Sequence, residues 1–236
     1  MTGVFFRKGM TVAIKPEDFK FIVDEDGAVK AEVVLSLHFD VMPTWIKFAI
    51  EHLENCRLYN QRRQEAWKGN DEEQKAETLE KEFEASMQSI IAMAIAIDSF
   101  YGTVKSKINI PKELTEKWKE NRTSRYIQIA ETVRQGFKLD KEGYKILKQT
   151  LKEIFRFRDM AIHPKGDIEH PILHPDLGVG VEWRFVYFSY ANSKVIVDEG
   201  LKRLHELLSK QGIKNKELEK YCLTTITELH KLIQIQ

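Results

Sequence analysis

The sequence predicts a mainly α-helical protein, a helical bundle that carries a small β-hairpin at its N-terminus. Three observations support this fold class. Two apolar segments flank the turn sequence Asp26-Gly27, a pattern typical of a β-hairpin. Beyond this hairpin, the apolar residues recur at helical spacing. Residues 179–188 are β-branched and aromatic, which indicates a short strand or hairpin. We therefore expect a β-hairpin appendage over residues 1–42 and a helical bundle domain over residues 43–236, with a short β insertion before its last two helices.

The composition is that of a soluble globular protein without an extreme charge. The 236 residues are 42% hydrophobic and 31% charged with a net charge of +1, so no overall field points to nucleic acid or a membrane. The most apolar stretch, Ile90 to Ile97, is shorter than the ~18 residues of a membrane span, and no signal peptide is evident. Cys56 and Cys222 form neither a disulfide framework nor a metal motif. We expect a cytoplasmic protein that does not contact a membrane.

The first two helices of the bundle are expected between Pro43 and Pro111. Thr44 is placed to cap the first helix, and Gly69-Asn70-Asp71 separates it from the second. The second helix is polar at first and strongly apolar later. The face of the first helix that is expected to meet the core contains Trp45, Phe48, Ala49, His52, Leu53, Cys56 and Tyr59.

Two more helices are expected before the long loop. A short segment leads into a helix over residues 123–135, for which Gly136 is a natural stop. Asp140 can cap the next helix. The apolar stripe of that helix consists of Tyr144, Leu147, Leu151, Ile154 and Phe155.

The remainder of the chain is expected to be a loop, the β insertion and two helices. Prolines and glycines are frequent in residues 164–180, which indicates a loop. Helical spacing returns over residues 192–210 and 215–233, and Gly212 lies between these two segments.

The apolar stripe of the helix that follows Asp140 ends with a charged residue, Arg158. With about 100° per residue, Arg158 falls near the centre of the apolar stripe, whereas Arg156 falls on the opposite, solvated face. A buried guanidinium needs an acidic partner because its desolvation costs several kcal/mol. Asp98 lies inside the apolar stripe of the second helix and is the predicted partner. Such a pair either fixes the packing of the two helices or orients Arg158 toward a phosphate.

A histidine follows that arginine at the end of the same helix. Because the residue before a proline is pushed out of the α region, we expect Pro164 to leave His163 on a released helix end. Imidazole exchanges protons near neutral pH, and arginine braces a phosphate through two parallel hydrogen bonds. Together they suit cleavage of a phosphodiester by an RNA 2′-hydroxyl, with His163 as base or acid and Arg158 stabilising the developing charge.

The segment Arg158-Asp159-Met160-Ala161-Ile162-His163 resembles the Arg-x4–6-His signature of HEPN domains, in which a polar residue often follows the arginine, as Asp159 does here. Many HEPN domains are helical bundles that dimerise and act as metal-independent ribonucleases, in toxins, antiviral defence and RNA processing. The resemblance implies that Arg158 and His163 are catalytic, that Asp159 supports them and that Asp98 is a supporting residue.

The same resemblance implies a set of partners. It points to RNA as substrate, a homodimer in which two motifs share one cleft, and a possible antitoxin or regulatory protein. It implies no metal and no other cofactor. The alternative is a non-catalytic HEPN-like module that binds a nucleotide, RNA or a protein partner, and a third possibility is a purely structural helical subunit.

Two other clusters have alternative interpretations. The loop after the motif either binds a transition metal or is simply polar and rich in proline. A basic face of the first helix either touches a phosphate backbone or is solvated. The loop cluster is His163, Asp167, His170, His174 and Asp176, and the basic face is Arg57, Arg62, Arg63 and Lys68.

Overall fold

The computed structural model describes residues 5, 10–23, 25–33, 35–163 and 168–233. The chain divides into two compact units, residues 1–41 and 42–236, and each unit is described by itself. The predicted fold class is confirmed: the protein is mainly helical, with antiparallel strand pairs near the N-terminus and a short strand pair before the C-terminal helices.

The N-terminal unit contains two antiparallel strand pairs. Strand β2 (Phe19–Val23) pairs with β3 (Val29–Val33), and Gly27 adopts a positive φ of 77° in the turn that joins them. This is the predicted hairpin, although its second strand begins earlier than the apolar pattern indicated. Strand β1 (Met10–Ala13) pairs with a separate strand, β4 (Ser36–Phe39), and a short 3-10 helix, η1 (Pro16–Asp18), precedes β2.

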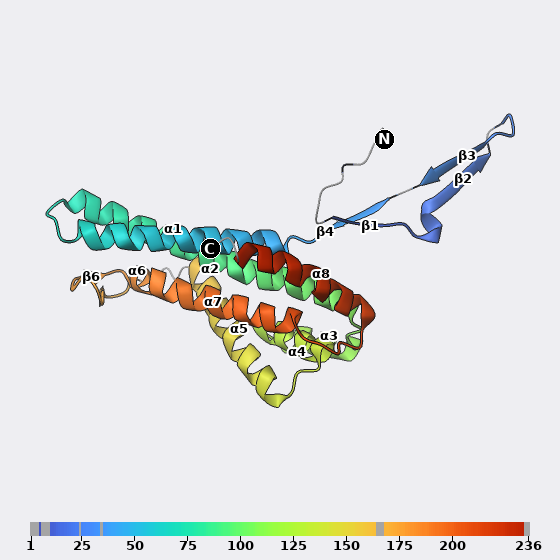
Figure 1. The fold of residues 1–236 in the computed structure, drawn as a ribbon. Helices are drawn as coiled ribbons and strands as arrows, with labels where there is room; N and C mark the ends of the chain where they lie inside the picture. Colours follow the sequence, from blue (N-terminus) through green and yellow to red (C-terminus); the bar gives the residue numbers. More distant parts are fainter. Residues whose placement is uncertain (1–4, 6–9, 24, 34, 164–167, 234–236) are drawn as a thin grey trace. The chain divides into compact units, whose positions relative to one another are not determined.

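The second unit is a bundle of helices, coloured from cyan to red in Figure 1. A long hairpin of α1 and α2 forms its centre, and the later helices pack against α2. The short pair β5–β6 is antiparallel and precedes α6, so the prediction of a strand or hairpin over residues 179–188 was wrong for residues 183–187, which are helical. The elements are α1 (Met42–Ala66), α2 (Glu72–Lys107), α3 (Lys112–Glu120), α4 (Arg125–Phe137), α5 (Lys141–Ile162), β5 (Ile172–Leu173), β6 (Gly180–Val181), α6 (Trp183–Tyr187), α7 (Tyr190–Leu208) and α8 (Lys216–Ile233).

The ends of the helices follow local chemistry. The Asp140 carboxylate accepts a hydrogen bond from the Gly143 backbone N–H at 2.7 Å, which confirms the predicted cap of α5. Helix α1 begins at Met42, so the prediction of Thr44 as its cap was wrong; Pro43 lies in the first turn, where a missing N–H costs nothing.

Gly136 was predicted to end α4, but the helix continues to Phe137. The glycine serves packing instead, because a Cβ at this position would lie 3.2 Å from the Leu218 Cδ2 atom. The helix ends at Lys138, which adopts the left-handed conformation with a φ of 48°.

The core runs along α2, with α1 on one side and α4, α5 and α7 on others. The predicted face of α1 was partly wrong, because Phe48 is 38% exposed, although Ala49 and Cys56 are buried as expected. Helix α2 is also long and apolar enough to cross a membrane, but 56% of its apolar window is buried inside the bundle. Such burial is typical of the core helix of a soluble protein.

Candidate functional site

Arg158 lies on the last turns of α5 with its side chain 24% exposed. Its Nε and Nη2 atoms donate hydrogen bonds to Oδ1 of Asp159 at 3.0 and 2.6 Å. Its guanidinium carbon lies 4.4 Å from the ring centroid of Phe155, which is buried. A guanidinium carries five N–H groups. Asp159 engages two of them, and no partner for the other three is found in the described part of the chain.

The structure corrects the predicted pair between Asp98 and Arg158. Asp98 instead accepts a hydrogen bond from Nε of Arg125 at 2.7 Å, and both side chains are more than one-third exposed. The guanidinium of Arg125 also lies 4.3 Å from the ring centroid of Tyr101. Asp98 therefore anchors the start of α4 to α2 and does not hold Arg158.

The predicted pair fails because the two residues lie at different levels of the bundle. Ile154 of α5 and Met93 of α2 both approach Gly200. Phe157, less than one turn further along α5, packs against Phe188, which packs against Phe83 of α2. The two helices therefore run in opposite directions, so the arginine is level with the part of α2 that precedes Met93, whereas the aspartate follows it.

His163 is the C-cap residue of α5 and is exposed. Its φ of −120° and ψ of 73° lie outside the helical region, which confirms the predicted release from the helix. Its backbone N–H donates to the carbonyl oxygen of Asp159 at 2.9 Å. Pro164, to which the prediction assigned this release, lies outside the described residues.

The end of α5 thus holds three predicted site residues together. The side chain of Asp159 positions the guanidinium of Arg158, and its carbonyl group ties down the backbone of His163. Arg156, two residues before Arg158, faces solvent as predicted and pairs with Glu153 at 2.9 Å. A part-exposed guanidinium can bind a phosphate, and an exposed imidazole on the same helix end can exchange protons.

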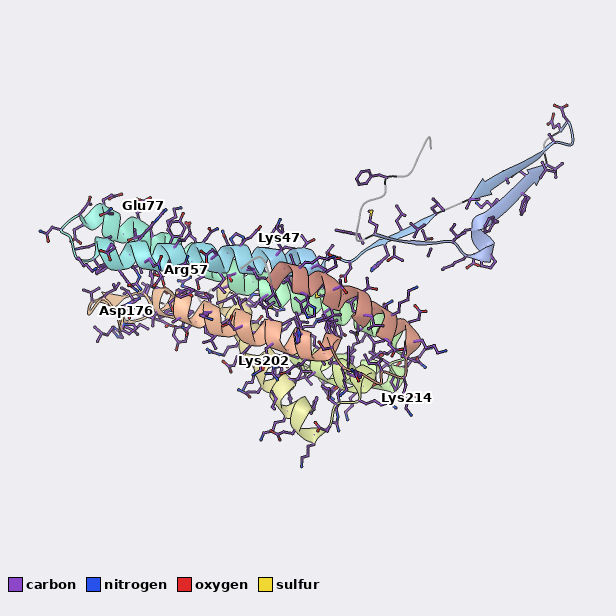
Figure 2. The ribbon with its side chains drawn as sticks, viewed as in Figure 1. Lys47, Arg57, Glu77, Asp176, Lys202 and Lys214 are labelled. Atoms are coloured by element: carbon purple, nitrogen blue, oxygen red, sulfur yellow. The ribbon has the colours of Figure 1, made fainter. Side chains whose placement is uncertain are left out.

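Arg63, which the sequence placed on a basic face that is either solvated or touches a phosphate backbone, instead belongs to a buried charged cluster. Arg63 is only 1% exposed, and its Nε donates to Oε2 of Glu82 at 2.5 Å. Its Nη2 donates to Oδ2 of Asp176 at 2.9 Å. The other oxygen of Glu82 accepts from Asn60 and from the backbone N–H of Tyr190, each at 3.0 Å. The cluster therefore ties α1, α2, the loop before β6 and the start of α7 together; Figure 2 shows Asp176 at this end of the bundle.

The signal for this burial is a seven-residue spacing along α1. Met42, Ala49, Cys56 and Arg63 recur at this interval, and all four are buried. The core-facing residues predicted for this helix ended at Tyr59, so the seven-residue spacing was not extended to Arg63. Burial and the nearby charge of Glu82 raise the pKa of the Cys56 thiol to about 12, so this cysteine is an inert core residue.

The loop that was considered as a metal site contains a buried histidine. His174 is 2% exposed, and its Nδ1 atom accepts the backbone N–H of Asp176 at 3.2 Å. Burial, with a further contribution from the positive charge of Arg63, lowers the pKa of His174 below its ordinary value. The described residues contain no group of three side chains that is arranged to hold a metal ion, and Asp167 lies outside them.

No family model matches this chain, and neither a curated protein nor a solved structure gives a match.

Proposed function

We propose that the protein is a metal-independent endoribonuclease of HEPN type that cleaves RNA at the end of α5. The observation that carries this proposal is the contact of Asp159 with Arg158. It holds a part-exposed guanidinium on the same helix end as His163 and leaves three N–H groups without a partner among the described residues. An arginine that only fixed packing would be buried and joined to carboxylates from other segments, as Arg63 is to Glu82 and Asp176.

The chemistry requires only the groups at this site and the RNA itself. The imidazole of His163 removes the proton of a ribose 2′-hydroxyl, and the 2′-oxygen attacks the adjacent phosphorus. Arg158 stabilises the negative charge that develops on the non-bridging oxygens. The bond from phosphorus to the 5′-oxygen breaks, this oxygen takes a proton, and a 2′,3′-cyclic phosphate is left on the upstream fragment.

A homodimer fits the requirement for both a base and an acid in this reaction. One imidazole cannot be neutral and protonated at once, so a second His163 from another copy of the chain supplies the leaving-group proton. We propose that such a ribonuclease serves as a toxin or an antiviral defence component and that an antitoxin or another regulatory protein restrains it.

The test is cleavage of single-stranded RNA by purified protein in excess chelator. We expect cleavage by the wild type with 2′,3′-cyclic phosphate ends, and a loss of about 100-fold or more in His163→Ala. The matched control is His170→Ala, which removes an exposed histidine outside the motif and is expected to cleave at the wild-type rate. RNA binding without cleavage, or equal cleavage by the two variants, would contradict the proposal.

A further inference from the structure

A groove between α4 and α5 concentrates positive charge on one surface of the bundle. It has a volume of about 940 Å³ and is lined by five basic side chains and one acidic side chain, so it has a local excess of four positive charges. The whole chain has a net charge of only +1, and this balance hides the local excess. The charged residues of the groove are Arg134, Lys141, Lys145, Lys148, Lys152 and Glu142.

These cations lack the acidic partners that lysines have elsewhere in the protein. Lys75 pairs with Glu72 at 2.7 Å, and Lys231 pairs with Glu228 at 2.7 Å. None of the five groove cations forms an ion pair with a carboxylate of the described residues. Like charges spaced three and four residues apart on a helix repel each other, so the cluster slightly destabilises α5. An anionic ligand removes this repulsion.

The lysines form a single line along α5. Lys141, Lys145, Lys148 and Lys152 fall within a sector of about 60° on the helix and span about 16 Å along its axis. A line of charge of this length matches the backbone of a polyanion better than it matches a single phosphate. Double-stranded and single-stranded nucleic acids both present such a backbone. The aromatic side chains of the groove indicate which of the two binds.

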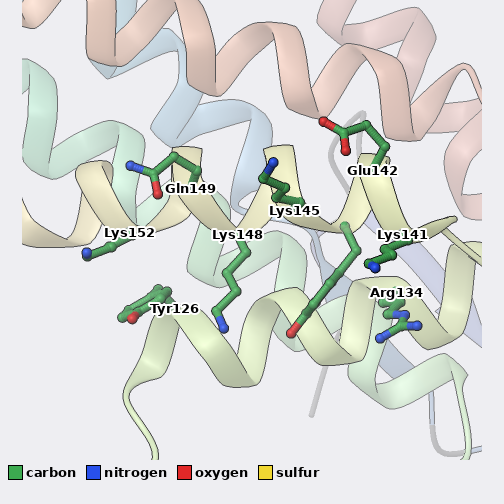
Figure 3. Close-up of a pocket in the computed structure, with 9 residues that line it drawn as sticks. Tyr126, Arg134, Lys141, Glu142, Lys145, Lys148, Gln149 and Lys152 are labelled. Carbon is green, nitrogen blue, oxygen red and sulfur yellow. The ribbon is translucent and has the colours of Figure 1, made fainter.

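Two tyrosines lie among these cations. The ring centroid of Tyr144 is 4.8 Å from the guanidinium carbon of Arg134 and 6.0 Å from Nζ of Lys148. Figure 3 shows Lys148 extending from α5 toward α4, where Tyr126 and Arg134 lie. Aromatic rings interleaved with cations are how proteins bind single strands, because unpaired bases stack on the rings while the cations contact phosphates.

The line of lysines leads toward the candidate catalytic residues. Asp159 lies in the same sector of α5 as the lysines, about 10 Å beyond Lys152 along the axis. Arg158 lies about 110° from the middle of this sector, so a strand that occupies the groove and continues along α5 reaches Asp159, which contacts Arg158.

We propose that the groove between α4 and α5 binds a single-stranded nucleic acid and directs it to the end of α5. That this strand is RNA, and that it is the substrate, rests on the proposed function; binding in the groove does not. The charge, the linear spacing and the tyrosines favour this occupant over a duplex or an acidic protein.

Binding is tested with a fluorescent single-stranded RNA in which every 2′-hydroxyl is methylated, so that the strand binds but cannot be cleaved. The groove variant is Lys145→Gln with Lys148→Gln and Lys152→Gln. The matched control, Lys68→Gln with Lys81→Gln and Lys231→Gln, removes the same charge from lysines that pair with nearby acids. Fluorescence anisotropy gives the Kd at several salt concentrations, and thermal melting shows that both variants are folded.

We expect the groove variant to bind about tenfold more weakly or worse, and the slope of log Kd against log salt concentration to fall by about 2. Tyr126→Ser is expected to weaken binding about tenfold. The charge control is expected to bind like the wild type. Equal affinities of the groove variant and the charge control would overturn the proposal, as would an absence of binding by the wild type or a preference for a duplex of the same length.

The binding result and the cleavage result test separate claims, so the ribonuclease proposal can be contradicted while the groove proposal is supported. Binding that depends on the groove, together with no cleavage of unmodified RNA by the wild type, supports the groove and contradicts the ribonuclease.

Discussion

Arg63 and Arg158 belong to the same residue type, and each contacts a carboxylate, but their surroundings differ. Arg63 is 1% exposed and is held by Glu82 and Asp176, which come from other parts of the chain. Arg158 is 24% exposed and is held by Asp159, its neighbour in sequence. The guanidinium of Arg63 joins distant segments of the chain. The guanidinium of Arg158 is positioned by its neighbour and stays partly exposed.

This difference separates a structural charge from a charge that is available for chemistry. Burying Arg63 costs desolvation energy, which its two carboxylates offset, so removing either side of the pair leaves a buried charge uncompensated. Arg158 avoids part of this cost because 24% of its side chain stays exposed. The predictions below test whether the stability of the fold depends on Arg63 and the rate of RNA cleavage depends on Arg158.

The largest effect on stability is expected for Arg63→Ala. This change leaves Glu82 buried without its guanidinium, and we expect the free energy of unfolding to fall by about 3–5 kcal/mol in urea titrations. Arg57→Ala is the matched control on the same helix, because Arg57 pairs with Glu54 at the surface. The double variant Arg63→Met with Glu82→Leu is expected to recover most of the loss; no recovery would contradict the role of the uncompensated charge.

Asp159→Asn is expected to lower the rate of RNA cleavage about tenfold, or about 1.4 kcal/mol, with little change in melting temperature. Asparagine keeps an acceptor oxygen but loses the charge that strengthens both hydrogen bonds to Arg158. Single-turnover kinetics in chelator measure the effect. A loss of melting temperature in proportion to the loss of rate would show that Asp159 supports the fold instead.

The lowered pKa of His174 is expected to make the stability of the fold decrease as the pH falls. Its pKa is lowered in the folded protein, so the unfolded chain takes up the proton first as the pH falls. Its contribution is therefore complete above the ordinary pKa of about 6.5 and is lost as the pH falls from there toward the lowered folded value. Melting temperatures of the wild type and His174→Asn at several pH values between about 7.5 and 5 measure this, and the variant is expected to show the flatter profile. Parallel profiles would contradict the contribution of His174.

The smallest effect is expected for Asp98→Asn. Its ion pair with Arg125 is more than one-third exposed, and pairs of this kind contribute at most about 1 kcal/mol. We expect RNA cleavage at the wild-type rate. A loss of cleavage as large as that of Asp159→Asn would restore Asp98 as a supporting residue of the site.

The sequence predicted the features that depend on neighbouring residues. The hairpin at Asp26-Gly27, the Asp140 cap and the opposite fates of Arg156 and Arg158 all follow from local chemistry or from position around one helix. His163 also leaves the helix as expected.

Features that depend on two helices were missed. A helical wheel gives the direction of a side chain but not its level in the bundle, so Asp98 was matched to Arg158 although it lies too far along α2. Arg63 was placed on an outer face, either solvated or in contact with phosphate, because its acidic partners, Glu82 and Asp176, are distant in sequence. The groove was missed because Arg134 and Tyr126 come from α4, although the line of four lysines follows from position around α5 alone.

The most direct test of the central claim compares Arg158→Ala with Arg156→Ala in RNA cleavage with excess chelator, at a temperature where both proteins are folded. The two changes remove the same group from the same helix, two residues apart. We predict that Arg158→Ala loses about 100-fold or more of the cleavage rate while Arg156→Ala stays within about twofold of the wild type. Equal rates for the two variants would contradict the claim that the guanidinium of Arg158 acts on RNA.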